Sequence, residues 1–71
     1  MTPTVASILR DFAFYGFTQS PLETAEIERA IAAGLDAADI YSLGCDCAAG
    51  FRFTEVFALY PAEKELADAD A

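Results

Sequence analysis

Hydrophobic residues in the first part of the chain recur at intervals of three and four, which is the spacing of one face of an amphipathic helix. The first run consists of Val5, Ile8, Leu9 and Phe12. Either Thr2, followed by a proline, or Thr4 can cap the start of this helix, because threonine side chains accept hydrogen bonds from free backbone amides. Gly16 can end it in the left-handed backbone conformation common at helix C-termini. The pattern predicts a helix over residues 3–15.

A second helix is predicted over residues 21–33. The segment 20–23, Ser-Pro-Leu-Glu, has serine in the cap position, proline in the first helical position and glutamate three residues after the serine. This is the pattern of a capping box. The inward face consists of Leu22, Ile27, Ala30 and Ile31. Gly34 ends the helix, and we expect Leu35 to fold back as the hydrophobic contact that accompanies such glycine caps.

Two more helices are predicted in the second half of the chain. Asp36 caps a short helix over residues 37–43, and Gly44 is its stop. Asp46 then caps a fourth helix over residues 47–60. The hydrophobic face of this last helix consists of Phe53, Val56, Phe57 and Tyr60.

Residues 51–54 also alternate hydrophobic and polar side chains as a strand would. A single strand has no partner elsewhere in the chain, so we prefer the helical interpretation. Pro61 ends the last helix, and residues 61–71 are predicted to form an acidic tail that frays. The sequence therefore predicts an all-α fold, with one domain over residues 1–60 that forms a compact small bundle of about four short helices.

The composition adds a strong charge to this picture. The 71 residues include twelve acidic and four basic side chains, a formal net charge of -8, and no histidine. The commonest general base and metal ligand is thus missing, and no serine or cysteine has a histidine to activate it. We therefore expect a binding protein rather than an enzyme, without a cofactor. Apolar runs too short for a membrane span and the lack of a secretion signal favour a cytoplasmic protein.

The two cysteines, Cys45 and Cys47, are separated by one residue. A disulfide between them would close a very small, strained ring, so a structural disulfide is not expected. Two thiolates also fall short of the four ligands of a structural zinc site. A redox-sensing or metal-sensing pair is one interpretation, and two partly buried apolar side chains is the preferred one.

Residues 26–43 resemble the helix-turn-helix family in their spacing. The matching residues are Ala30, Gly34, Leu35, Ile40 and Leu43, a small residue where two helices touch, a glycine at the turn and apolar anchors. Arg29 departs from the pattern, since an apolar residue is usual there. At least five carboxylates lie on this corner, and each repels a nearby phosphate by about 1 kcal/mol. Packing is therefore the preferred role of the corner, and direct nucleic-acid binding is not expected.

The acidic residues suggest a basic partner instead. Carboxylates three residues apart on a helix, such as Glu23 with Glu26 or Asp36 with Asp39, have Cβ atoms about 5–6 Å apart, close to the spacing of phosphates on one strand. A groove built to bind DNA also attracts such an array. The candidate partner-binding acids are Glu23, Glu26, Glu28, Asp36, Asp39, Asp11, Asp46 and Glu55. Ordinary capping and solubility explain some of these acids individually.

In size, acidity and absence of catalytic residues, the whole chain resembles small phage-encoded inhibitors of bacterial defence, including anti-CRISPR proteins that imitate DNA. The resemblance implies a basic, DNA-binding partner such as a CRISPR surveillance complex or another host enzyme. Inhibition would follow from occupying the groove that reads DNA or the PAM, in the cytoplasm of an infected bacterium. We expect a monomer.

An alternative interpretation is a small adaptor or subunit that docks, or associates with itself, through aromatic residues. Phe14, Tyr15 and Phe17 follow the hydrophobic stripe of the first predicted helix and exceed what one stripe can bury. Phe51 and Tyr60 add to this set. Aromatic side chains of this kind are enriched at the energetic centres of protein interfaces.

Overall fold

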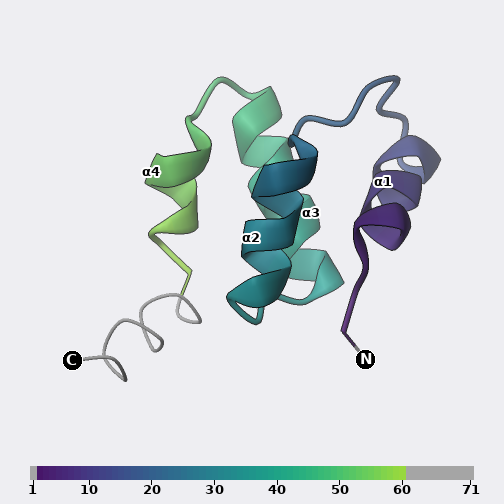
Figure 1. Ribbon diagram of the computed structural model, residues 1–71. Coiled ribbons are helices and arrows are strands. Elements are labelled where there is room, and N and C mark those ends of the chain that lie inside the picture. The colour runs from purple at the N-terminus through teal and green to yellow at the C-terminus, as the bar shows by residue number, and fades with distance from the viewer. Residues whose placement is uncertain (1, 61–71) are drawn as a thin grey trace.

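A computed structural model describes residues 2–60, and within that range it contains four α-helices and no β-strand (Figure 1). They are α1 (Val5–Phe14), α2 (Thr24–Ala32), α3 (Ala37–Ala48) and α4 (Phe53–Phe57). The predicted small all-α fold is confirmed. The predicted acidic tail, including Pro61, lies outside the described residues.

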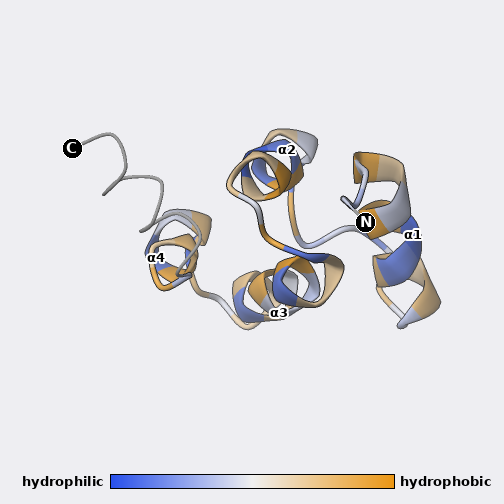
Figure 2. Cartoon of the chain, turned by 90° about the horizontal axis from the view of Figure 1, so that it is seen from below, coloured by the Kyte–Doolittle hydropathy of each residue, from blue (hydrophilic) through white to orange (hydrophobic). Residues whose placement is uncertain are grey.

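The pair α2 and α3 forms the centre of the fold, with α1 on one side and α4 on the other (Figures 1 and 2). The two central helices run in opposite directions on either side of Gly34, as in an αα-hairpin. Buried hydrophobic side chains of the helices meet in one cluster. No helix in the described range is long and apolar enough to cross a membrane.

The first helix begins at Val5, two residues later than predicted. Of the two possible caps, Thr4 is the one used: its Oγ1 accepts a hydrogen bond from the Ser7 amide at 3.1 Å, and the Thr4 amide donates to Ser7 Oγ at 3.0 Å. This reciprocal pair is a capping box in which serine replaces the usual glutamate. Gly16 follows the helix with φ of 101°, as the sequence predicts.

The predicted start of the second helix is wrong by three residues. The Ser20 hydroxyl accepts a hydrogen bond from the Leu22 amide (3.2 Å) and donates to the Leu22 carbonyl (2.7 Å), so it closes a local turn rather than capping a helix. This turn buries Leu22 before the helix begins. The actual capping box is formed by Glu23 and Glu26, and Glu26 Oε1 accepts from the Glu23 amide at 2.8 Å.

The third helix is longer than predicted. Asp36 caps it as expected, with Oδ1 accepting from the Asp39 amide at 2.9 Å. Gly44 does not stop it: the helix continues to Ala48, and Gly44 is buried inside it. A Cβ atom at Gly44 would overlap the ring of Phe12, so the glycine allows α1 and α3 to approach closely. Gly50, with φ of 111°, is the residue that follows the end of α3.

The fourth helix is much shorter than predicted. Asp46 lies inside α3 and caps nothing there, and α4 begins at Phe53 after Arg52. Its hydrophobic stripe is correct: Phe53, Val56 and Phe57 are buried. The strand alternative for residues 51–54 is therefore wrong, because the stripe packs at helical spacing against α3.

The end of α2 confirms the predicted glycine cap. The Leu35 amide donates to the Ala30 carbonyl at 3.1 Å, and the Gly34 amide donates to the Ile31 carbonyl at 3.0 Å. These two bonds define a Schellman motif, which requires the left-handed conformation that Gly34 adopts at φ of 91°. Leu35 is buried, so the same motif that ends the helix adds a side chain to the core.

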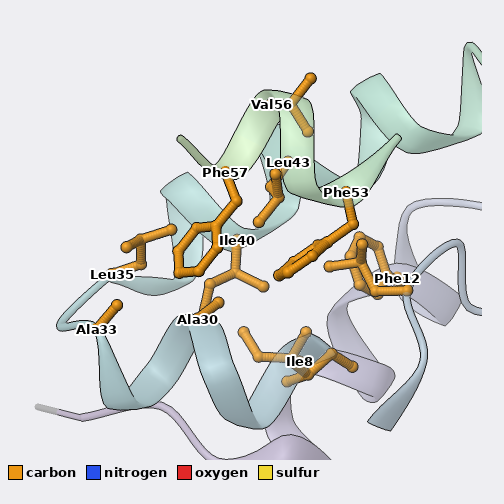
Figure 3. Packing of buried hydrophobic residues seen from close by; sticks show 12 residues of the cluster. Ile8, Phe12, Ala30, Ala33, Leu35, Ile40, Leu43, Phe53, Val56 and Phe57 are labelled. Atoms are coloured by element: carbon orange, nitrogen blue, oxygen red, sulfur yellow. The ribbon is translucent and has the colours of Figure 1, made fainter. Parts of the chain in front are cut away.

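One hydrophobic core joins all four helices (Figure 3). Its members are Ile8, Phe12, Leu22, Ile27, Ala30, Ala33, Leu35, Ile40, Leu43, Phe53, Val56 and Phe57. Burying one large apolar side chain contributes roughly 1.5–3 kcal/mol, so these residues supply the main stabilisation. Within residues 2–60 no polar or charged residue is fully buried, so every side chain there that could act on another molecule is exposed or half-buried.

Candidate functional site

The structure separates the two acidic pairs that the sequence suggested would act together. Glu23 and Glu26 lie at the start of α2, and Asp36 and Asp39 lie at the start of α3. Since the two helices run in opposite directions, their starts lie at opposite ends of the central hairpin (Figure 1). At 1.5 Å per residue, the nine residues of α2 put about 14 Å between these ends.

Each pair also has a structural role. The Glu26 carboxylate accepts a hydrogen bond from the Glu23 amide, and the Asp36 carboxylate accepts one from the Asp39 amide. One carboxylate in each pair therefore caps its helix. All four acids also lie near a helix N-terminus, where the helix dipole favours negative charge. The capping interpretation therefore accounts for the position of these pairs without a partner.

Asp46 of α3 shares an ionisable neighbour with one acid from each of these separated pairs. Glu26 and Asp46 both act electrostatically on Cys47, while Asp46 and Asp39 both act on Tyr60. We call Glu26, Asp39 and Asp46 the acidic edge. Asp39 and Asp46 are exposed, and Glu26 is half-buried.

The acidic edge affects the pKa values of two neighbouring side chains, Cys47 and Tyr60. Burial raises the pKa of the Cys47 thiol, and the carboxylates of Glu26 and Asp46 raise it further. Burial likewise raises the pKa of the Tyr60 hydroxyl, with Asp46, Asp39 and Cys47 adding to the effect. Both shifts have the sign expected when a group must ionise beside existing negative charge.

The remaining candidate acids lie elsewhere. Glu28 on α2 and Glu55 in the first turn of α4 are exposed. Asp11 on α1 is half-buried and lies beside aromatic side chains rather than other acids. The eight candidates are thus distributed over several parts of the surface, and three of them form the acidic edge.

The aromatic candidates divide into two kinds. Phe14 is 80% exposed and Tyr15 is 62% exposed, and their rings meet edge to face at 5.2 Å. Phe17 is half-buried, and its ring meets that of Phe12 edge to face at 5.5 Å. Phe17 therefore belongs with the packing of the core, whereas Phe14 and Tyr15 are free to contact another molecule.

Tyr41, which sequence analysis missed, links these two kinds of aromatic residue. Its ring lies 4.8 Å from that of Tyr15 and 5.7 Å from that of Phe12. A side-chain hydrogen bond with Cys45 raises the pKa of the Tyr41 hydroxyl, with desolvation and nearby charges adding to the effect. In the sequence, one spacing points to this position: Tyr41 comes four residues after Ala37 and two after Asp39. A helix therefore places Tyr41 on the same side as Ala37 and away from Asp39.

Tyr15 and Tyr41 line a hollow between the end of α1 and the start of α3. We call it the tyrosine groove; it has a volume of about 470 Å³ and is lined by Asp11, Tyr15, Ala37, Ala38, Tyr41 and Ser42. Tyr15, the residue that follows α1, comes one turn after Asp11, and Tyr41 comes one turn after Ala37 on α3. The small residues of α3 leave the space, and the two tyrosine rings provide its apolar surface.

The two cysteines are free thiols, and both are half-buried in α3. Residues two apart on a helix point about 200° from each other, so Cys45 and Cys47 face different neighbours. Cys45 contacts Tyr41 near the groove, and Cys47 lies at the acidic edge. Among residues 2–60 there is no group of three or more acidic, cysteine or histidine side chains placed to hold a metal ion.

Comparison with protein-family models, with curated proteins and with solved structures found no match.

Proposed function

We propose that this chain is a non-catalytic acidic protein that binds the basic, DNA-binding surface of a partner protein and blocks DNA there. The observation that carries the proposal is the acidic edge, where Asp39 and Asp46 of α3 lie near Tyr60, and Asp46 and Glu26 of α2 lie near Cys47. A cationic groove attracts negative charges held in a fixed pattern more strongly than the same charges on a flexible chain, because less conformational entropy is lost on binding.

The spacing within the acidic edge supports this proposal. Asp39 and Asp46 are seven residues apart on α3, which corresponds to two helical turns and a rise of about 10 Å. Four successive phosphates on one strand of B-DNA, three steps of about 3.4 Å, also span about 10 Å along the axis. A row of basic side chains placed for phosphates can therefore meet both carboxylates.

The overall charge supports it as well. The described residues include eight carboxylates and three arginines. This excess of negative charge attracts a basic partner and speeds the encounter with it. The same charge repels phosphate groups. The finer form of the proposal is an anti-CRISPR protein that occupies the DNA or PAM groove of a surveillance complex in an infected bacterium.

Capture from a nuclease-treated bacterial lysate, followed by elution with duplex DNA, tests the proposal. The wild-type protein should retain proteins that duplex DNA or high salt releases. The double variant Asp39→Asn/Asp46→Asn should lose most of this captured material. The matched control Glu28→Gln/Glu55→Gln removes the same charge from other exposed positions and should retain it. Captured proteins that resist DNA elution, or equal losses in both double variants, would contradict the proposal.

A second candidate function is favoured by the exposure of Phe14 and Tyr15. Under this alternative the chain is an adaptor or subunit that docks through these aromatic side chains. Apolar docking depends little on ionic strength, whereas an acidic contact weakens steeply as salt rises. A captured partner that survives high salt but is lost with Phe14→Ala/Tyr15→Ala would favour the adaptor.

A further inference from the structure

The tyrosine groove is separate from the acidic edge and combines two features. It has two aromatic rings, Tyr15 and Tyr41, whose centroids are 4.8 Å apart, and one half-buried carboxylate, that of Asp11. Three of its other lining residues, Ala37, Ala38 and Ser42, have small side chains, so a long side chain from another molecule can enter. Arg10, which is next to Asp11 in the chain, is not among the residues that line the groove.

This combination selects for one kind of side chain. A guanidinium group is planar, stacks on aromatic faces and forms paired hydrogen bonds with a carboxylate. An ammonium group is a compact charge that stays strongly hydrated and makes no such stack. A neutral apolar side chain would cover the tyrosines but would leave the carboxylate of Asp11 partly desolvated without a partner.

We propose that the tyrosine groove binds an arginine side chain from a basic segment of a partner protein. The guanidinium lies against the rings of Tyr15 and Tyr41 and pairs with the carboxylate of Asp11. Phe14, exposed beside Tyr15, extends the apolar surface for the residues that flank the arginine. This inference rests on the proposed function, since it assumes a basic partner, and it names the side chain that the partner inserts.

A nuclear magnetic resonance titration with short oligoarginine and oligolysine peptides of equal length tests the inference. Oligoarginine should shift the backbone signals of Tyr15, Ala37, Ala38 and Tyr41 more than those of the rest of the chain. It should also bind several-fold more tightly than oligolysine. Equal affinity for the two peptides, or shifts spread evenly over the surface, would overturn the inference.

Variants make the same test sharper. Asp11→Asn should weaken oligoarginine binding about tenfold, the loss of one charge-assisted contact. Tyr15→Ala should weaken it about threefold, since stacking at an exposed site is worth less. The matched control Glu28→Gln removes the same charge outside both the groove and the acidic edge and should change affinity less than about twofold. Equal weakening by Asp11→Asn and Glu28→Gln would show that only overall charge matters, and would overturn the inference.

The outcomes also separate this inference from the proposed function. If oligoarginine fills the groove but no captured protein is released by duplex DNA, the DNA-blocking function fails and the groove stands. If duplex DNA releases a captured partner but oligoarginine shows no preference for the groove, only the present inference fails. Groove signals that shift with protein concentration alone would identify a second copy as the occupant and overturn it.

Discussion

The two long edges of α3 differ in chemistry although they belong to one helix. The edge toward α1 carries Tyr41, which contacts Phe12 and Tyr15, and the buried Gly44 lies against Phe12. The edge toward α4 carries Asp39 and Asp46, which lie near Tyr60. The first edge is aromatic and in part tightly packed, and the second is lined with carboxylates at the surface.

The difference shows how a short helix can serve packing and recognition at once. Ile40 and Leu43 lie between the two edges and are fully buried, so they anchor α3 in the core. The residues to either side reach the surface and differ in what they attract: a guanidinium at the tyrosine groove, a row of cations at the acidic edge. Substitutions in the packed region should lower stability, and substitutions at the two surface sites should change binding.

The largest effect, a loss of stability, is expected from Phe12→Ala, because the Phe12 ring of α1 packs against the aromatic edge of α3. Truncating a fully buried phenylalanine costs about 3–5 kcal/mol, and Phe12 is 1% exposed. A chain of this length has a free energy of unfolding of only about 4–11 kcal/mol, so the variant should unfold at much lower urea concentration. Urea denaturation followed by circular dichroism measures this. Tyr15→Ala, three residues away but 62% exposed, is the control and should change stability by less than about 1 kcal/mol.

Gly44→Ala tests the close approach of α1 and α3. In an exposed helix this change stabilises by up to about 1 kcal/mol. Here the new methyl group would overlap the Phe12 ring and lie 3.1 Å from Pro21 Cγ, so we expect a net loss of about 1–3 kcal/mol. Ser42→Ala, exposed on the same helix, should be neutral or slightly stabilising. A Gly44→Ala variant as stable as the wild type would mean that the two helices are not packed this tightly.

Asp36→Ala tests whether the acids at the start of α3 act in folding. Loss of the hydrogen bond from the Asp39 amide should cost about 1 kcal/mol. Asp36→Asn keeps the acceptor oxygen and should lose only a few tenths of a kcal/mol, which isolates the cap from the charge. Thermal denaturation of the three proteins gives the comparison. If Asn and Ala variants lose equal stability, the charge matters and the hydrogen bond does not.

The smallest effect concerns pH at the acidic edge. The pKa of Cys47 is raised in the folded protein, so the folded state keeps the thiol proton after the unfolded state has lost it. The resulting stabilisation is present below the ordinary thiol pKa and is lost as pH rises through the raised value. Urea midpoints should therefore fall slightly with increasing pH in this alkaline range. Cys47→Ala should reduce the slope, and an unchanged slope would show that Cys47 is not the titrating group.

The sequence predicted local features well where one residue type decides the outcome. The Asp36 cap, the Gly34 turn with Leu35 folded back, and the stripe of Phe53, Val56 and Phe57 are all confirmed. Side-chain hydrogen bonding at a helix start, positive φ at a helix end and helical periodicity are local properties. The same applies to the all-α class.

The candidate site was harder to predict because its members come from different helices. The spacing of acids along the chain pointed to the pairs at the two helix starts, and antiparallel packing places these pairs apart. Glu26 is a neighbour of Cys47 only because α2 and α3 lie side by side. Tyr41 likewise became part of the groove only through its contact with Tyr15, which follows α1.

The amino-acid sequence by itself determined the number of helices, most of the buried residues and the excess of negative charge. Tertiary structure alone decided the role of Gly44, which local rules assign to a helix end and which packing against Phe12 keeps inside α3. It also decided which charges and rings became neighbours. The physical reason is that caps and periodicity depend on residues within one turn, whereas close packing and electrostatic contact depend on segments far apart in the chain.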